Sequence, residues 1–248
     1  MRSDSASSRR GLRAAAVCVL LALTALALPA VGQAARIKHQ VVSHPGFTST
    51  WAYLESPTYV YAAPSRHAHV LGYLGLTTQD GTSELLLEQQ RVLIKGAWWV
   101  QVRLPLRPAG QIGWVPQQVL GAPQTVHTYV VVSTEKMTLT LYRNGKVIFV
   151  TRVGTGKAST PTPHGQFYIR DRLDGFPAGS IYGPLAFGTS ALSNVETDWP
   201  GGGVIGIHGT DEPSLIPGHP SHGCIRVPNW DIVQLAKLLP IGTPLTIE

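Results

Sequence analysis

The residues best suited to covalent chemistry lie close together near the C-terminal end of the sequence. His208, His219 and His222 fall within fifteen positions of one another, and Cys224 follows them directly. A thiol is mostly protonated near neutral pH and needs a base to become a nucleophile, and histidine is the usual partner. The spacing therefore predicts that Cys224 is a nucleophile with a histidine as its general base.

The glycines beside these residues fit the same chemistry. His208 is expected at the end of a strand, where Gly209 lets the chain turn so that a backbone carbonyl can hold the second ring nitrogen. Gly223 would let the backbone approach a substrate closely, and its amide, with that of Cys224, could donate to a developing oxyanion. Arg226 is placed to bind a substrate carboxylate.

Other interpretations of this cluster stay open at the level of residues. A free cysteine is more often a small buried apolar residue than a nucleophile. The histidines, Asp211 and Cys224 are all possible zinc ligands, but their spacing fits no common zinc pattern, so we expect no metal and no cofactor. Spacing alone also leaves His222 in competition with His208 as the base.

The charge and the cysteines are unevenly distributed along the chain. The 248 residues carry 20 Lys and Arg against 14 Asp and Glu, a net charge of +6, and two cysteines. Residues 1–35 hold Arg2, Arg9, Arg10 and Arg13 against Asp4, which is half of the net charge, and they also hold Cys18. The remainder is weakly basic with one thiol, which argues against nucleic-acid binding and against an internal disulfide.

The first 35 residues have the three parts of a secretory signal peptide. Arginines precede an apolar stretch over 14–28, and Pro29 and small residues up to Ala34 follow it. We expect cleavage near Ala34, with an uncleaved membrane anchor as the alternative, and contact with a membrane only in that case. Either way, the body of the protein is predicted to be exported to the cell envelope.

The rest of the chain predicts a folded, β-rich protein in two domains. We expect a linker over 36–57, a small barrel of short strands over 58–121 and a second β-rich domain over 122–248. In the second domain, Asn144-Gly145 predicts a hairpin, 202–208 and 242–247 predict strands, and 230–239 predicts a helix capped by Asn229. Trp98, Trp99 and Trp114 could form a ligand surface, but at least one of the adjacent Trp98 and Trp99 should face a barrel core.

Two stretches of sequence resemble known families. "IHGT…SHGCIRV", with "VGTGKASTPTPHGQFYI" upstream, resembles the catalytic domain of bacterial L,D-transpeptidases over about 127–247. "GAWWVQVRL…GQIGWVPQQVL" resembles bacterial Src-homology-3-like (SH3-like) domains. The resemblance implies an all-β sandwich with a short helix, preceded by an SH3-like barrel. It also implies roles for the residues of the motif: the nucleophile Cys224, the base His208, the base-orienting Gly209, and the substrate-binding Ser221, His222, Gly223 and Arg226.

The same resemblance implies the reaction and the partners. Cys224 would attack the carbonyl between the third stem-peptide residue of peptidoglycan and the terminal D-residue, forming a thioester that an amine of a second stem resolves into a crosslink. Water as the acceptor would give an L,D-carboxypeptidase, and loss of catalysis would leave a wall-binding protein. Papain-like enzymes are disfavoured because their cysteine precedes the histidine, whereas here His208 precedes Cys224. The barrel is a candidate for glycan contact.

Overall fold

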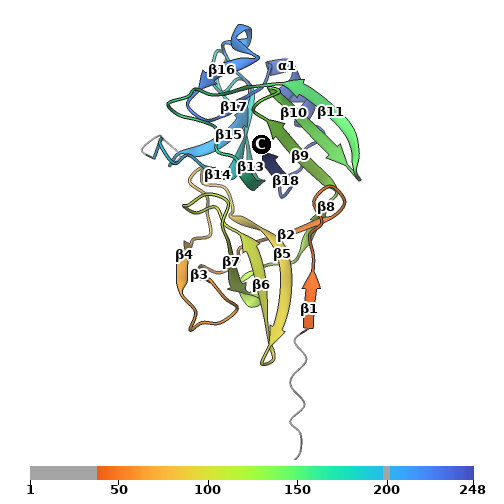
Figure 1. Ribbon diagram of the computed structural model, residues 1–248, viewed down its shortest axis with the longest axis vertical. Coiled ribbons are helices and arrows are strands. Elements are labelled where there is room, and N and C mark those ends of the chain that lie inside the picture. Colours follow the sequence, from red (N-terminus) through yellow and green to blue (C-terminus); the bar gives the residue numbers. More distant parts are fainter. Residues whose placement is uncertain (1–37, 198–201) are drawn as a thin grey trace, which may run out of the picture. The chain divides into compact units, whose positions relative to one another are not determined.

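A computed structural model describes residues 38–197 and 202–248, and within them the chain consists mainly of β-strands (Figure 1). The strands form an N-terminal sheet of eight strands and a C-terminal sheet of ten. The helical segments of this part of the chain are one short α-helix and two 3-10 turns, Gln117–Val119 and Pro213–Leu215. The predicted all-β class with a short helix is therefore confirmed. The predicted signal peptide lies outside the described residues.

The N-terminal sheet contains the first eight strands of the described chain. Their bounds are β1 Lys38–Val41, β2 Ser49–Tyr53, β3 Thr58–Tyr61, β4 Val70–Leu74, β5 Leu85–Ile94, β6 Ala97–Arg103, β7 Ile112–Pro116 and β8 Gln124–Val126. They run in the order β4-β3-β7-β6-β5-β2-β8, and β1 also pairs with β5. Alternate side chains of these strands meet in one apolar cluster that includes Ala52, Val60, Leu86, Val100 and Val115.

Residues 36–57, which we expected to be a linker, contain two paired strands. Strand β1 pairs with β5 from Lys38 opposite Leu93, and β2 pairs with the same strand from Thr50 opposite Glu88. Four of the five residues of β2 are buried. Because the partner strand lies far along the chain, no local turn signals this pairing, and Pro45 and Gly46 in the intervening turn resemble linker composition.

The tryptophans of the N-terminal sheet differ in their burial. Trp99 and Trp114 are buried in a small cluster with Tyr61 and Val92, and the Trp99 and Tyr61 rings meet edge-to-face at 5.7 Å. Trp98 is half-buried and lies on the opposite face of the strand from Trp99. One of the adjacent tryptophans is therefore buried, but in this small cluster and not in the larger apolar cluster that contains Val100.

The C-terminal sheet contains the remaining ten strands. Their bounds are β9 Thr128–Ser133, β10 Thr138–Arg143, β11 Lys146–Arg152, β12 Gly154–Gly156, β13 Gly165–Asp174, β14 Leu185–Leu192, β15 Val204–His208, β16 Gly218–Ser221, β17 Ile225–Arg226 and β18 Pro244–Ile247. They run in the order β11-β10-β9-β18-β13-β14-β15-β17-β12-β16. The predicted hairpin is present between β10 and β11, where Asn144 and Gly145 both have positive φ. The predicted closing strand is β18.

The helix begins one residue earlier and ends sooner than predicted. Helix α1 spans Asn229–Leu235 and buries Ile232 and Leu235 against the core of the C-terminal sheet. Asn229 is its first helical residue and makes no capping hydrogen bond, so the predicted cap is wrong. Its side chain instead accepts a hydrogen bond from the backbone of Thr210, 2.8 Å away, in the loop after β15.

Buried polar contacts join β13 of the C-terminal sheet to the start of β5. The Arg170 guanidinium and the Glu84 carboxylate form a two-pronged ion pair in which both side chains are almost completely buried. The Tyr168 hydroxyl donates to the carbonyl of Leu85 at 2.9 Å. The described residues accordingly form one compact unit.

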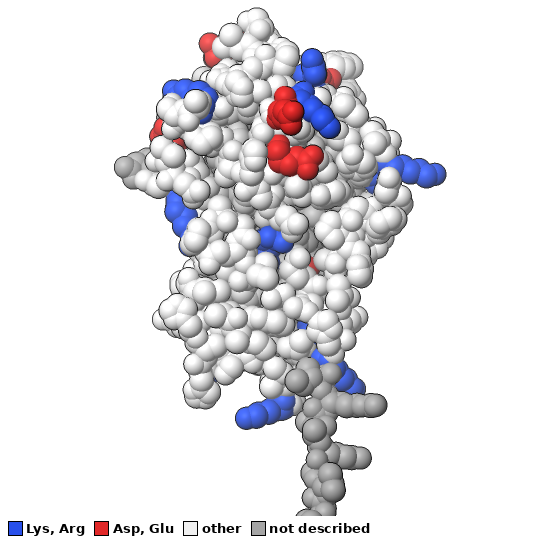
Figure 2. Space-filling model, in the orientation of Figure 1, with Lys and Arg blue, Asp and Glu red and all other residues white. Residues whose placement is uncertain are grey.

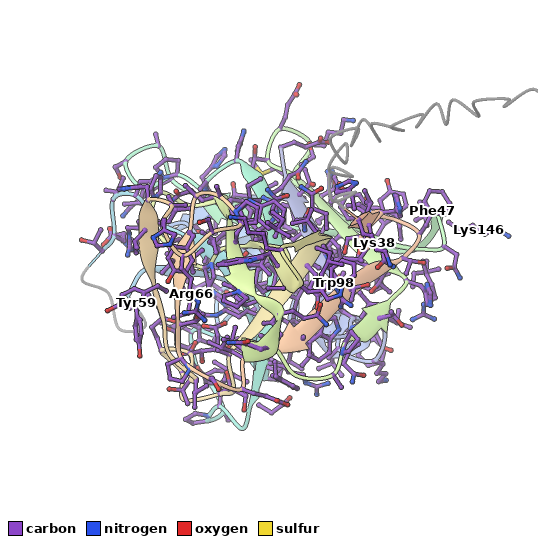
Figure 3. All side chains as sticks on the ribbon, turned by 90° about the horizontal axis from the view of Figure 1, so that it is seen from below. Lys38, Phe47, Tyr59, Arg66, Trp98 and Lys146 are labelled. Atoms are coloured by element: carbon purple, nitrogen blue, oxygen red, sulfur yellow. The ribbon has the colours of Figure 1, made fainter. Side chains whose placement is uncertain are left out.

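The loop before β2 makes a second set of contacts with the C-terminal sheet. The Gly145 amide donates to the Gly46 carbonyl at 2.7 Å, and Phe47 lies beside this hairpin, next to Lys146 (Figure 3). On the face shown in Figure 2 most of the surface is uncharged, and Lys and Arg lie at separate places. No helix within the described ranges combines the length and the apolar character needed to cross a bilayer.

The buried ion pair gives a first prediction. Replacing Glu84 with Leu leaves the buried charge of Arg170 uncompensated, so the free energy of unfolding should fall by about 3–5 kcal/mol. The double variant Glu84→Leu/Arg170→Met removes both charges and should recover most of that loss, as urea unfolding would show. A double variant no more stable than the single one would contradict this account.

Candidate active site

Two parallel strands bring the predicted nucleophile and base together. Strand β15 ends at His208, and β17 begins directly after Cys224; the two strands pair with Ile207 opposite Ile225. Gly206 lies beneath both reactive groups, because a Cβ placed on it would be 3.5 Å from the His208 ring and 3.8 Å from the Cys224 sulfur. The thiol and the imidazole therefore converge over a residue without a side chain.

The His208 ring is buried, and one backbone atom fixes its orientation. Its Nδ1 lies 2.5 Å from the Gly209 carbonyl oxygen, so Nδ1–H donates there and Nε2 remains the basic nitrogen. The Tyr182 ring packs edge-on against the imidazole at 5.1 Å. Burial lowers the pKa of His208 to about 4, although the Gly209 bond and Asp211 oppose the change. The imidazole is therefore neutral near neutral pH and able to accept a proton.

The thiol is also neutral at rest. Burial raises the pKa of Cys224, while a hydrogen bond from the Gly206 amide, 3.4 Å from the sulfur, and the charge of Arg226 act in the opposite direction. The resting pair is a thiol beside a neutral imidazole rather than a thiolate beside an imidazolium. A nucleophilic attack by this sulfur would therefore require the proton to move at the same time.

The loop before Cys224 is held by hydroxyl groups and needs glycine at one position. Gly223 has φ +122°, and a Cβ there would lie 2.9 Å from the Ile205 side chain. The Ser221 hydroxyl donates to the Cys224 carbonyl at 2.6 Å and accepts from the Gly223 amide at 3.1 Å. The Gly223 carbonyl accepts from Thr162 at 2.8 Å. The Gly223 amide is thus engaged with Ser221 here, contrary to the expectation that it faces a developing oxyanion.

The remaining motif residues lie at the entrance to the site. Arg226 forms an ion pair with Glu212, with 2.8 Å between Nη1 and Oε2. His222 is exposed, and its Nε2 lies 2.8 Å from the ammonium group of Lys157. The structure therefore places His208 in the buried position over Gly206 and His222 at the surface. Among the described residues, no three His, Cys, Asp or Glu side chains gather as metal ligands would.

Asn229 is a site residue that the sequence did not reveal. Its Oδ1 holds the Thr210 amide, and a Cβ added to either Gly209 or Gly183 would lie within 2.4 Å of that oxygen. The side chain thus fixes the turn whose carbonyl orients the base. Asn229 stands just before a helical pattern in the sequence. Such a position predicts a helix cap, and it does not predict a hydrogen bond to another loop.

Two clefts open at the reactive pair and share His208, Cys224, Tyr182 and Val204 in their walls. They have similar sizes, about 710 and 720 Å³ including their open mouths. We call the first the Arg226 cleft, because Arg226 lines it with Ser221, His222 and Glu196. We call the second the Asp80 cleft, because Asp80 lines it with the apolar residues Leu173, Phe176, Ala186 and Phe187.

The lowered pKa of His208 predicts a pH dependence of folding. Between pH 6.5, where the unfolded histidine titrates, and about 4, the unfolded chain binds the proton and the folded chain does not. Stability should therefore be complete above this window and fall by about 3 kcal/mol as the pH drops through it. Urea unfolding at several pH values would measure this decline.

Matched variants isolate the contribution of His208 to that decline. In His208→Gln the part of the slope that comes from this group should vanish, whereas His222→Gln, at an exposed position, should keep the wild-type slope. Equal slopes in the wild type and His208→Gln would contradict the assignment.

Comparison with known proteins identifies relatives of this chain. Residues 127–247 match the YkuD family, described as the L,D-transpeptidase catalytic domain. A Bacillus subtilis protein named as an L,D-transpeptidase, YkuD, is 38% identical over 142 residues, covering 56% of this chain and 76% of that protein. A Bacillus licheniformis protein of the same name is 35% identical over 125 residues, covering 50% of this chain and 68% of that protein.

The solved catalytic domain of the E. faecium L,D-transpeptidase is 29% identical, covers 49% of this chain and 96% of that one, and has a TM-score of 0.36. The extent of the two Bacillus matches confirms the resemblance seen in the motif, and this chain belongs to the YkuD family of L,D-transpeptidases.

Proposed function

We propose that Cys224 is the nucleophile and His208 the general base of an L,D-transpeptidase reaction on peptidoglycan stem peptides. The observation that carries the proposal is the buried imidazole with Nδ1 held by Gly209, beside a thiol at the junction of two clefts. This arrangement leaves Nε2 free to take the thiol proton. Family membership supports the substrate class.

The neutral resting pair suggests the order of proton movements. As the Cys224 sulfur attacks the carbonyl between the third stem residue and the terminal D-residue, Nε2 of His208 takes the thiol proton. The imidazolium then gives that proton to the departing amine of D-alanine, and a thioester remains. An amine of a second stem attacks the thioester, loses its proton to His208, and releases the crosslinked peptide and the thiol.

The motif residues then divide between holding the loop and contacting substrate. Ser221 and Gly223 shape the loop that presents Cys224, and the amide of Cys224 itself is our candidate donor to the oxyanion. Arg226 and His222 line the cleft where a donor peptide could place a carboxylate. Gly209 acts through its carbonyl on the base.

The remaining expectations about the whole chain stay proposals. We propose a signal peptide at 1–35 and export to the cell envelope, where the family's substrate lies. We also propose an SH3-like domain whose central strands fall in 58–121, with β1, β2 and β8 added from outside that range. Glycan contact by this domain remains a prediction.

Acylation by a carbapenem tests the nucleophile and the base. The wild-type protein should gain the mass of one carbapenem, and Cys224→Ala should gain none. His208→Ala should acylate on the order of 10²- to 10⁴-fold more slowly, because it lacks the base. His222→Ala tests the other candidate base and should acylate faster than His208→Ala, because His222 lies at the surface. An adduct on Cys224→Ala, or acylation lost only in His222→Ala, would refute these roles.

Stem peptides test the reaction itself. Incubation with a tetrapeptide donor and an amine-bearing stem should yield crosslinked dimers and free D-alanine, both measurable by mass spectrometry. Shortened stems without dimers would instead identify an L,D-carboxypeptidase. Intact peptides alongside a normal carbapenem adduct would show that the acyl donor is of another kind.

A further inference from the structure

The Asp80 cleft contains a charge that comes from outside the catalytic domain. Asp80 lies in the loop between β4 and β5 of the N-terminal sheet, yet it lines the same cleft as Cys224 and His208. The other residues in the walls of this cleft are apolar, glycine, Tyr182 or the reactive pair. Because burial keeps His208 neutral, Asp80 is the charged side chain of this cleft.

Hydrogen bonds on both sides hold the Asp80 loop against the catalytic domain. Arg170 donates to the Gln79 side chain at 2.7 Å, and the Thr82 hydroxyl donates to Asp171 at 3.0 Å. Within the loop, the Asp80 amide donates to the Thr78 hydroxyl at 3.2 Å. The backbone that carries Asp80 is therefore fixed at the rim of the cleft.

The Asp80 carboxylate forms no ion pair within the described part of the chain. The four ion pairs found there do not include Asp80. Arg170 is the neighbouring cation, but it is already committed to Glu84 and Gln79. Partial burial and the negative charge of Asp171 raise the pKa of Asp80, and the charge of Arg170 opposes this change without cancelling it, so an incoming cation would be favoured.

The two clefts differ in the charge that they offer to a substrate. The Arg226 cleft contains the Arg226 guanidinium and the Glu196 carboxylate. Arg226 pairs with Glu212 through Nη1, and the carboxylate of a donor peptide could bind the same guanidinium. The Asp80 cleft offers a lone carboxylate at its mouth and apolar walls leading to the thiol. An acyl acceptor that enters with a protonated amine fits the second cleft and would pass Asp80 before it reaches the thioester.

We propose that Asp80 selects an amine over water as the acyl acceptor, by binding the ammonium group of an acceptor peptide at the mouth of the cleft that leads to Cys224. The inference rests on the proposed function, since it concerns the second half of that reaction. Asp80 binds and positions the acceptor, and it takes no part in forming the thioester. The ammonium gives one proton to solvent as it leaves Asp80; His208 takes the second proton as the amine attacks and passes it to the departing Cys224 sulfur.

The test measures how the acyl-enzyme divides between an amine and water. The purified full chain is incubated with a tetrapeptide donor and increasing amounts of an amine-bearing stem, and dimer and hydrolysed stem are quantified by mass spectrometry. In Asp80→Asn the acceptor KM should rise about fivefold, the size of effect expected from one partly exposed charge pair. Because the interaction is electrostatic, added salt should weaken the wild-type preference for the amine and hardly change that of the variant.

Three controls separate this effect from general damage. Glu135→Gln removes an exposed carboxylate that lines neither cleft, and it should keep the wild-type ratio of dimer to hydrolysed stem. Hydroxylamine, an acceptor that is neutral at the assay pH, should react equally well with the wild type and Asp80→Asn. Carbapenem acylation, which needs no amine, should also be equal in the two proteins.

The outcomes distinguish this inference from the proposed function. Missing acylation of the wild type refutes the proposed function, and the inference fails with it. Normal acylation with an unchanged ratio of dimer to hydrolysed stem in Asp80→Asn overturns the inference alone. The inference is also overturned if the wild type only hydrolyses its thioester. It is overturned as well if Asp80→Asn reacts more slowly with hydroxylamine to the same extent as with the cationic amine.

Discussion

The parallel pairing of β15 with β17 is the constraint on which the active site depends. With Ile207 opposite Ile225, the loop that carries Cys224 must enter the sheet beside the end that carries His208. Gly206 makes this approach possible, because its amide can reach the sulfur and it has no side chain between the reactive groups. The separation of thiol and base is thus set by the register of a sheet. Hydroxyl groups of Ser221 and Thr162 then fix the intervening loop.

Burial determines the protonation state of this pair. The imidazole and the thiol both lose hydration in the fold, which lowers the pKa of His208 and raises that of Cys224. The Gly209 carbonyl would favour an imidazolium, but this contribution is smaller than the cost of burying the charge. In the resting site the thiol is therefore protonated. Its reactivity depends on a well-oriented base that accepts the proton during attack.

The N-terminal sheet takes part in building the site through the start of β5. Glu84 neutralises Arg170 in a buried ion pair, and the loop just before it carries Asp80 to the rim of the second cleft. The same contact that joins the two sheets thus leaves Asp80 without a cation of its own. This arrangement links a structural interaction to the charge that an acceptor would meet.

Residue types and short-range patterns in the sequence determined the reactive centre and the local turns. The spacing of Cys224 from nearby histidines and glycines predicted a thiol nucleophile with His208 or His222 as its base, and Asn144-Gly145 predicted its hairpin. The tertiary structure alone decided the strands within 36–57, the partner of Asn229, the engagement of the Gly223 amide and the position of Asp80. The physical reason is that local sequence encodes backbone preferences over a few residues. Hydrogen bonds between distant segments exist only once the sheets have set their register and packed.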